Sequence, residues 1–422
     1  MESIKGAKLD GQQGTFSRRD LLKGALALTV AASVSEVFGQ QPTGAPSGTV
    51  WLYVGTYTAG SNGNGIYLFQ LDLFTGELTL LKVVAPPLPA SGLNPSTASP
   101  SWLALDPTRT HLYAGNEYGP PGAVSAYSIN RLTGDLTLLN GQPTVGAPVH
   151  VSVDQQGKFL FCAEYSGGYF EVFPIQANGS LGAAVFQQQD IGNIGAHFAS
   201  NGPPGSFAFS AHEGPNGHPH QLETDLSNQW AIGTDTGQDR IYIWKLTQGI
   251  TPPLTPAAIP FVTTPTGDGP RRFAFHPNGV WLYSIQEEAS TIMFWSFNRA
   301  TGALSSEQII PSVPPGFAGT SFASEIRVSA DGDFVYAANR LSDTVCVFKV
   351  GGDGRLTQKS QASTLGDYPR TFAIDPLGRF VVVANQRADN LTTFSVKPGN
   401  GTLKFVGNYT PVGSPAAIVY LS

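Results

Sequence analysis

One strand-like pattern recurs along the chain, and this repeat limits the folds that the chain can adopt. In each copy an apolar run leads to a polar anchor residue, a short turn follows, and a second apolar run ends in polar side chains. A period near fifty residues, built from strands with no helical stretch between them, is typical of four-stranded sheets arranged radially as the blades of a propeller. The six anchors are 48, 71, 51, 53 and 46 residues apart and are Asp106, Asp154, Asp225, His276, Ser329 and Asp375.

The two ends of the chain supply the strands of one more copy. Residues 415–421 look like a first strand with nothing after it, and residues 50–57 look like a second strand with nothing before it. Pairing them would close a ring and remove the free strand edges of an open array. We therefore predict an all-β fold, a seven-bladed β-propeller over residues 46–422, closed by strands from both termini.

Residues 1–45 lack the repeat and are predicted to be a twin-arginine signal peptide and linker. Arg18 and Arg19 precede a short apolar segment, residues 24–33, which is too short for a stable membrane span. The twin-arginine export machinery would then be a partner during targeting, and the protein would be periplasmic or secreted. Cys162 and Cys346 lie in apolar runs of different copies, so two buried free thiols are expected.

Composition and missing motifs exclude several classes of function. The net charge is −6 and the lysines and arginines are scattered, which argues against a nucleic-acid partner. The chain has no Walker loop, no dinucleotide-binding glycine pattern and no nucleophile elbow, so we expect no cofactor and no covalent serine mechanism.

Counting from each anchor as position 0 places the polar residues on the predicted hairpins. The first strand covers about −5 to −1 and the second reaches about +11, so −5 and +11 are predicted to face each other at the end away from the turn. Because first strands line the channel of a propeller, residues at −5, −4 and +11 should surround one mouth of it. Three long connections, residues 85–100, 180–217 and 311–323, emerge on that side.

The predicted mouth is rich in ionisable groups, although only 13% of the chain is charged. Some of them have a purely structural explanation, since Arg271 opposite Glu287, and Glu325 diagonal to Arg340, would form cross-strand ion pairs. The candidates at −5 and −4 include His150, His220, Arg271, Arg272, Glu325 and Arg370, and those at +11 are Glu117, Tyr165, Thr236, Glu287, Arg340 and Gln386.

The histidines divide into mouth and turn candidates. His218 and His220 flank a proline beside the mouth, and without a nearby cysteine they are too sparse for a zinc site, so no metal is predicted. His197 and His212 lie in the long insertion. His276 replaces an anchor aspartate and is expected to be a turn residue, while the anchor aspartates should accept bonds from turn amides.

Several segments resemble the seven-bladed propeller lactonases, a family that includes a bacterial 6-phosphogluconolactonase and the fungal carboxymuconate lactonising enzyme. They are residues 269–279 leading to Glu287, 323–332 leading to Arg340, 369–370 leading to Gln386, and the opening 53–58. The resemblance implies a catalytic site of His218 or His220, Arg271, Glu287 and Arg340. The other mouth candidates, expected to contact substrate, are His150, Arg272, Glu325, Arg370 and Gln386.

The resemblance predicts a 6-phosphogluconolactonase-like lactone hydrolase whose partner is a small lactone or sugar acid. A histidine would take a proton from the attacking water, the arginines would stabilise the oxyanion or hold a carboxylate, and Glu287 would orient one of them. Family members commonly carry an Arg-Gln pair shortly before the His-x-His segment, where this chain has residues 213–217, and the loss of that cation, with export, argues against a phosphorylated substrate. Arg272 also stands where the family often has histidine. Two alternatives stay open: a muconate-type lactonising enzyme and a propeller that only binds a ligand or protein.

Overall fold

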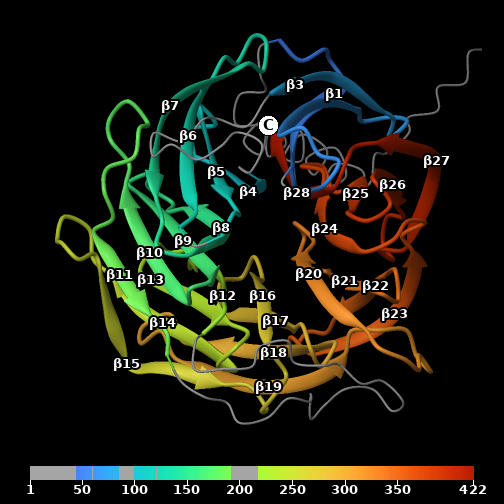
Figure 1. The fold of residues 1–422 in the computed structure, drawn as a ribbon. Helices are drawn as coiled ribbons and strands as arrows, with labels where there is room; N and C mark the ends of the chain where they lie inside the picture. The colour runs from blue at the N-terminus through green and yellow to red at the C-terminus, as the bar shows by residue number, and fades with distance from the viewer. Residues whose placement is uncertain (1–43, 59, 85–98, 120, 192–216) are drawn as a thin grey trace, which may run out of the picture. The chain divides into compact units, whose positions relative to one another are not determined.

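The computed structural model describes residues 44–58, 60–84, 99–119, 121–191 and 217–422. Within these ranges the regular structure consists of 28 strands, which form seven antiparallel four-stranded sheets around a central axis (Figure 1). The predicted seven-bladed, all-β propeller is confirmed. Chain contacts separate residues 1–40 from 41–422, and the predicted export signal lies outside the described residues except for its last two positions.

We number the blades by the chain order of their innermost strands. Blade 1 contains β4 (Pro100–Leu105), β5 (His111–Asn116), β6 (Ala123–Ile129) and β7 (Leu136–Pro143). Blade 2 contains β8 (Ala147–Val153), β9 (Phe159–Ser166), β10 (Tyr169–Pro174) and β11 (Phe186–Gln189). Blade 3 contains β12 (Pro219–Thr224), β13 (Trp230–Asp235), β14 (Arg240–Leu246) and β15 (Leu254–Thr263).

The remaining blades follow the same plan. Blade 4 contains β16 (Pro270–Phe275), β17 (Trp281–Gln286), β18 (Thr291–Phe297) and β19 (Leu304–Pro311). Blade 5 contains β20 (Phe322–Val328), β21 (Phe334–Arg340), β22 (Thr344–Val350) and β23 (Leu356–Ser363). Blade 6 contains β24 (Pro369–Ile374), β25 (Phe380–Asn385), β26 (Asn390–Val396) and β27 (Leu403–Pro411), and blade 7 contains β28 (Pro415–Leu421), β1 (Thr49–Thr56), β2 (Ile66–Asp72) and β3 (Leu78–Val84).

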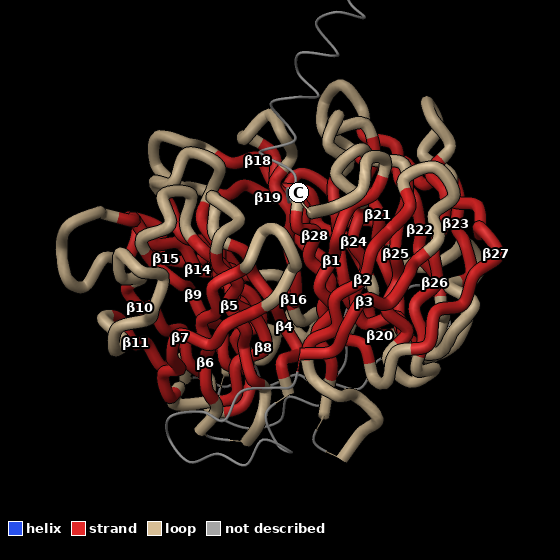
Figure 2. The backbone as a smooth tube through the Cα atoms, turned by 90° about the horizontal axis from the view of Figure 1, so that it is seen from above, coloured by secondary structure: helices blue, strands red, loops and turns tan. Residues whose placement is uncertain are grey.

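Blade 7 closes the ring with strands from both ends of the described chain, as predicted. β28 lies beside β1 (Figure 2). The two strands pair antiparallel, and Tyr53 lies opposite Val419. β28 also contacts the innermost strands of blades 1 and 6, β4 and β24. The closure leaves no innermost strand without a neighbour on either side.

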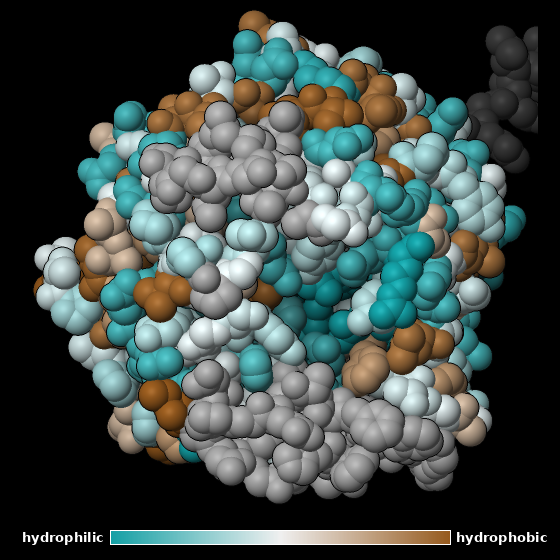
Figure 3. Space-filling model, viewed as in Figure 1, coloured by the Kyte–Doolittle hydropathy of each residue, from teal (hydrophilic) through white to brown (hydrophobic). Residues whose placement is uncertain are grey.

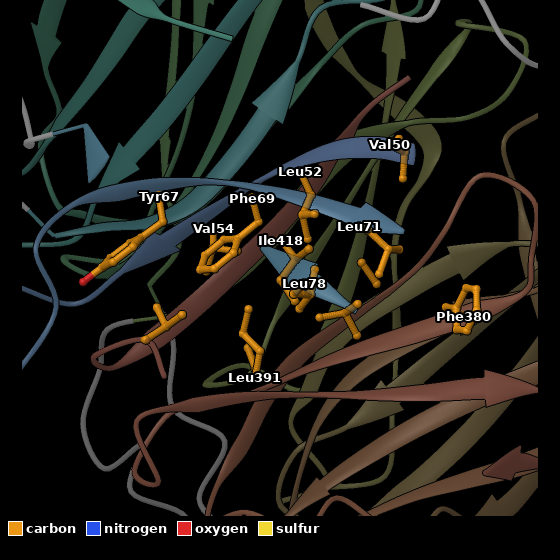
Figure 4. Close-up of a cluster of buried hydrophobic side chains, with 14 of the residues drawn as sticks. Val50, Leu52, Val54, Tyr67, Phe69, Leu71, Leu78, Phe380, Leu391 and Ile418 are labelled. Atoms are coloured by element: carbon orange, nitrogen blue, oxygen red, sulfur yellow. The ribbon is translucent and has the colours of Figure 1, made fainter. Parts of the chain in front are cut away.

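The core consists of seven apolar clusters, one at each interface between neighbouring blades. Between blades 6 and 7, Val54 and Phe69 pack with Phe380 and Leu391 (Figure 4). Second and third strands are apolar on both faces because each sheet is covered on both sides, whereas β23, an outermost strand, alternates between buried and exposed residues. Burying one such large side chain contributes about 1.5–3 kcal/mol. The predicted buried free thiols, Cys162 and Cys346, are confirmed.

Tyrosines on second strands clasp successive blades together. The Tyr336 hydroxyl donates to the Gly401 carbonyl at 3.1 Å, and Tyr53, Tyr113 and Tyr283 make the same bond to the next blade at 2.8–3.0 Å. The acceptor is always a glycine in the turn between the third and fourth strands. At Gly354, the acceptor for Tyr283, φ is +85° and a Cβ would lie 2.3 Å from the Phe294 ring, so only glycine fits there.

The turn ends of the hairpins match their prediction. Asp106, Asp154, Asp225 and Asp375 each accept at least two turn amides, as in the bonds to Asp375 Oδ1 from Arg379 N at 2.6 Å and Phe380 N at 2.5 Å. His276 is a turn residue: its Nδ1 accepts from Asn278 N, and its Nε2 donates to the Gly332 carbonyl.

The mouth ends of the hairpins correct the predicted register. In blade 4, Pro270 pairs with Gln286 and Arg272 pairs with Ile285, so Arg271 at −5 is an unpaired bulge residue and does not lie directly opposite +11. A proline at −6, present in six of seven blades, has no N–H for the ladder and favours an irregular strand start. A bulge of this kind re-aims the side chain that it carries. The other bulge residues are Ser101, Val149, His220, Ser324, Arg370 and Ala416.

Candidate functional site

A carboxylate held between two arginines forms the centre of the candidate site. Glu287, directly after β17, contacts Arg271 Nε at 2.7 Å through Oε2 and Arg340 Nη2 at 2.6 Å through Oε1. Both guanidinium groups are buried, with 1% and 4% of the residue exposed. The predicted pair of Arg271 and Glu287 is therefore present, and Glu287 also connects blade 4 to blade 5.

The two arginines differ in how many of their guanidinium nitrogens have an acceptor among the described residues. Arg340 donates through Nε to the Phe322 carbonyl, through Nη1 to the Tyr368 hydroxyl and through Nη2 to the Ala323 carbonyl, all at 3.2–3.3 Å. Arg271 Nη1 donates to the Ser324 carbonyl, while Arg271 Nη2 bonds to no described residue. Burial lowers the pKa of Arg271 to about 10, so it stays charged at neutral pH.

The second predicted ion pair, between Glu325 and Arg340, does not form. Glu325 at −4 contacts Arg327 Nε at 3.5 Å and accepts a bond from the Thr371 hydroxyl at 3.0 Å. The bulge at Ser324 separates the −4 residue from the +11 level, and Glu287 already occupies Arg340. Glu325 therefore belongs to the channel wall together with its own strand neighbour Arg327.

His218 lies half-buried against Tyr165, with ring centroids 4.5 Å apart. Its Nδ1 is 3.0 Å from the Tyr165 carbonyl oxygen, which can only accept, so Nδ1 carries the proton and Nε2 is the basic nitrogen of the neutral ring. Burial lowers the pKa of His218, although the Tyr165 carbonyl and the charge of Glu287 act in the opposite direction. The ring is therefore neutral near pH 7 and within the field of Glu287.

His220 and His150 have different surroundings. His220 is the bulge residue of β12, only 3% exposed, and its Nδ1 has no partner among the described residues. Burial and the nearby charge of Arg271 lower the pKa of His220 well below its usual value. His150 packs against Trp102, with centroids 5.0 Å apart, and its Nδ1 accepts from Leu222 N at 3.5 Å.

A second polar cluster joins blades 7, 1 and 6. Glu117 Oε2 accepts from the Tyr57 hydroxyl at 2.5 Å and from the Ser101 hydroxyl at 2.7 Å, and lies 3.5 Å from Arg370 Nη2. The Arg370 guanidinium also covers the Tyr57 ring at 4.8 Å. Sequence reasoning missed Tyr57 because blade 7 is built from both ends of the chain, so counting forward from its anchor does not reach the second strand. Carrying the numbering across the closure places Tyr57 at +11.

Tyr368 is a further mouth residue that sequence reasoning missed. Its backbone φ is +64°, a conformation that costs a non-glycine residue about 1 kcal/mol, and its amide donates to Asp343 Oδ1 at 2.9 Å. Its ring lies between the guanidinium groups of Arg387, at 3.7 Å, and Arg340, at 5.1 Å. An aromatic residue immediately before the proline at −6 is a slight signal, and the sequence contains no other.

The other predicted substrate contacts lie in different surroundings. Arg272 crosses the channel, stacks on Trp102 at 3.8 Å and donates through Nη2 to the Val149 carbonyl at 3.2 Å. Gln386 bonds through its backbone N–H to the Tyr368 carbonyl, and its side-chain oxygen has no partner among the described residues. His197 and His212 lie outside the described residues.

The mouth is a hydrophilic hollow near the centre of the ring (Figure 3). Over the described ranges, no group of three or more histidine, cysteine, aspartate or glutamate side chains is arranged to hold a metal ion. The same ranges contain no helix long and apolar enough to cross a membrane.

Comparison with known proteins gives one consistent answer. Residues 51–420 match the family model "Lactonase, 7-bladed beta-propeller". The 6-phosphogluconolactonase of Bacillus subtilis is 33% identical over 87% of this chain and 97% of its own, and that of Serratia proteamaculans is 30% identical over 85% and 95%. Among solved structures, a periplasmic gluconolactonase of Pseudomonas aeruginosa is 28% identical with a TM-score of 0.75, covering 89% of this chain and 99% of its own.

Proposed function

Because the chain belongs to the seven-bladed β-propeller lactonase family, we propose that it hydrolyses a sugar lactone at the mouth of the ring. As a lactonase it is a carboxylic ester hydrolase. The observation that carries the proposal for the site is the neutral, tautomer-fixed His218 in the field of the carboxylate shared by Arg271 and Arg340.

In the proposed reaction, His218 Nε2 takes a proton from a water molecule as it attacks the lactone carbonyl carbon. The oxyanion of the tetrahedral intermediate accepts a bond from Arg271 Nη2, the nitrogen of that guanidinium without a described partner. Collapse of the intermediate breaks the ring C–O bond, and the proton on His218 passes to the departing alkoxide. Glu287 and Arg340 are positioning residues that hold Arg271 in place.

Of the two histidines that the resemblance implies, the structure supports His218 as the base more than His220. His220 is almost fully buried, and protonating it would add a cation near Arg271, Arg272 and Arg370. His218 would instead be protonated in the field of Glu287. An imidazolium is therefore less costly at His218.

We further propose that the protein acts in the periplasm or outside the cell. The support is the twin-arginine pattern around Arg18 and Arg19 and the periplasmic gluconolactonase among the similar structures. Signal cleavage and fractionation of the native host test this proposal. A full-length cytoplasmic protein would contradict it.

A panel of aldonolactones, with released acid as the readout, tests the activity. His218→Gln should lower kcat/KM by about 100-fold or more, the usual contribution of a general base, while the melting temperature changes little. His276→Gln at the turn end is the matched control and should keep the wild-type rate. A full rate in His218→Gln together with a large loss in His220→Gln would move the base to His220.

The same panel separates the alternatives. Release of acid at the rate of a buffer blank for every lactone, combined with binding of a sugar acid, would favour a propeller that only binds. Ring closure of an unsaturated diacid in place of opening would favour a lactonising enzyme, in which the same arginines hold carboxylates.

The pH dependence of the rate follows from the direction of the His218 shift. Burial lowers the pKa of His218, so the base stays unprotonated to a lower pH than a free imidazole. The acid limb of kcat/KM should therefore fall below pH 6.5, the usual value for histidine. A limb well above that value would mean that another group acts as the base.

A further inference from the structure

The end of β13 and the turn after it, residues 234–239, contact the backbone on both sides of the candidate site. β13 pairs with β12, the strand that follows His218, and it also contacts β16, which carries Arg271. β12 and β16 are neighbouring innermost strands around the axis (Figure 1). Three polar side chains of this segment, Thr234, Asp235 and Asp239, are buried, with at most 4% of each residue exposed. We call residues 234–239 the blade 3 clamp.

On one side, the clamp binds the backbone of His218. Asp235 Oδ1 accepts the His218 N–H at 2.8 Å, together with the N–H groups of Gly237 and Gln238 in the turn. Thr236 donates to the His218 carbonyl through its N–H at 3.1 Å and through its hydroxyl at 3.0 Å. Both polar groups of the His218 backbone are therefore bonded to the clamp.

On the other side, the clamp binds the backbone that carries Arg271 and supports Glu287. The Thr234 hydroxyl donates to the Arg271 carbonyl at 2.8 Å. Asp239 Oδ1 accepts the Gly269 N–H at 2.8 Å, and the Gly269 carbonyl accepts the Glu287 N–H at 2.7 Å. Gly269 has a φ of +68°, which favours glycine, and lies two residues before Arg271. Asp239 therefore fixes a backbone segment that leads directly to the proposed oxyanion donor.

An aspartate 14 residues after the anchor, as Asp239 is, also occurs in blade 6. Asp389 occupies that position and accepts the Ser414 N–H at 2.7 Å. Ser414, like Gly269, directly precedes the proline of the next first strand, but the bulge residue there is Ala416, which has no polar side chain. The aspartate bond therefore belongs to the repeat, and in blade 3 it supports a segment that carries a functional side chain.

We propose that the blade 3 clamp fixes the distance between the base, His218, and the oxyanion donor, Arg271. Thr234 and Asp239 are then positioning residues of the reaction, which act through the backbone of other residues. This inference rests on the proposed lactone hydrolysis. A base and an oxyanion donor act together only when both reach the same carbonyl group, and a misplacement of about 1 Å can cost about 100-fold in rate. Because one short buried segment holds both backbones, the two groups move apart only if its bonds break.

Two matched aspartates test the proposal in steady-state kinetics with an aldonolactone that the wild-type protein hydrolyses. Asp239 accepts two amides, from Gly267 and Gly269, and an asparagine side chain has only one oxygen. Asp239→Asn should therefore lower kcat by about tenfold or more with little change in KM. Asp389→Asn makes the same change where the bulge residue is Ala416 and should keep the wild-type kcat. Equal kcat values in the two variants would overturn the positioning role, even if both proteins lose stability.

Two matched threonines repeat the test without a change of charge. Thr234→Val removes the hydroxyl that holds the Arg271 carbonyl and should lower kcat by about threefold or more, whereas Thr234→Ser retains the hydroxyl and should keep the wild-type value. Thr144→Val removes a buried hydroxyl bond of the same length, to the Gly146 carbonyl in the connection to blade 2, and should leave kcat unchanged. Should Asp239→Asn not fold, the smaller change in Thr234→Val carries the test. An unchanged kcat in Thr234→Val contradicts the proposal.

Hydrogen exchange at the Arg271 Nε–H measures the same positioning without turnover. This group contacts Glu287 Oε2 at 2.7 Å, and its NMR signal is assigned by its loss in Arg271→Lys. The exchange should be at least about threefold faster in Thr234→Val than in wild type, and unchanged in Thr144→Val. That result would support the clamp even if wild type hydrolysed no lactone, an outcome that would overturn only the proposed function. Wild-type exchange in Thr234→Val would overturn the clamp and leave the hydrolase intact.

Discussion

The two ends of each hairpin show how one repeat can carry both stability and chemistry. At the turn end the blades are nearly alike, since aspartate or a substitute accepts the amides that follow, as at Asp225 and Asp375. At the mouth end the bulge residue varies between blades: Arg271 and Ser324 both occupy the −5 bulge, yet only the arginine contacts the carboxylate of Glu287.

The difference follows from what each end must satisfy. A tight turn leaves the same backbone amides without partners in every blade, so one carboxylate position serves all of them. The mouth end has a bulge in every blade, which frees the −5 side chain from the ladder and lets it vary with little effect on the sheet. Function is therefore expected at the mouth end and stability at the turn end.

The largest expected effect is on catalytic rate, and it distinguishes an arginine at the mouth end from an arginine at the turn end. Arg271→Met removes the proposed oxyanion donor and should lower kcat/KM for an aldonolactone by roughly 100-fold or more. Glu287 keeps Arg340 as a partner, so the protein should still fold. Arg379→Met at the turn end is the matched control. Similar rates for the two variants would abolish the functional distinction between the ends.

The next effect is on stability and belongs to the turn end. Asp375→Ala leaves the amides of Arg379 and Phe380 without their acceptor and should lower the free energy of unfolding by about 2 kcal/mol in urea denaturation. The rate of lactone opening at 25 °C should not change. Ser329→Ala removes only one turn-amide bond, from Phe334 N, together with the bond that the hydroxyl donates to the exposed Asp331, and should cost less. A loss of activity without a loss of stability in Asp375→Ala would reverse the expected division.

A third prediction concerns an acid at +10, the position directly before the mouth residues. Asn116, Gln286, Asn339 and Asn385 stand there in four blades, but blade 2 has Glu164, which contacts Glu171 and accepts from Gly146 N at 2.5 Å. Burial, with Glu171 close by, raises the pKa of Glu164 far above its usual range. Two ionised carboxylates can only accept, so their contact requires a shared proton.

The sign of the pH effect follows from that raised pKa. The unfolded chain releases this proton near pH 4.3 and the folded one only at much higher pH, so stability is lost as pH rises above about 4.3. Glu164→Gln keeps the donor to Glu171 and removes the titration. It should therefore gain about 1 kcal/mol or more relative to wild type between pH 5 and pH 8. Urea denaturation at the two pH values measures this, and an equal difference at both would refute the shared proton.

The smallest effect tests the clasps between blades. Tyr336→Phe removes the bond to the Gly401 carbonyl and should cost about 1 kcal/mol of stability with no change in lactone hydrolysis. Tyr409→Phe is the control, because Tyr409 is 55% exposed. Equal melting temperatures for both variants and wild type would show that the clasp contributes nothing measurable.

Several features of the site were predictable because they depend on counting along a repeat. The positions of Glu287 and Arg340 at +11 and of Arg271 at −5 follow from the anchors at His276 and Ser329, and the structure joins the three side chains in one cluster. The same counting from an anchor, continued across the closure in blade 7, would also have found Tyr57. Tyr368 was not, since its placement depends on a left-handed backbone and two arginines from elsewhere in the chain.

The sequence by itself determined the seven blades, the closure in blade 7 and the carboxylates of the turns, because these depend on periodicity and on local bonds between residues a few positions apart. Only the tertiary structure decided the bulged register, the partner of Glu325, the tautomer of His218 and the path of Arg272 across the channel. Those features depend on which blades face one another around the axis and on how each buried polar group finds a partner there. Contacts between Arg272 and residues more than one hundred positions away leave no local pattern in the chain.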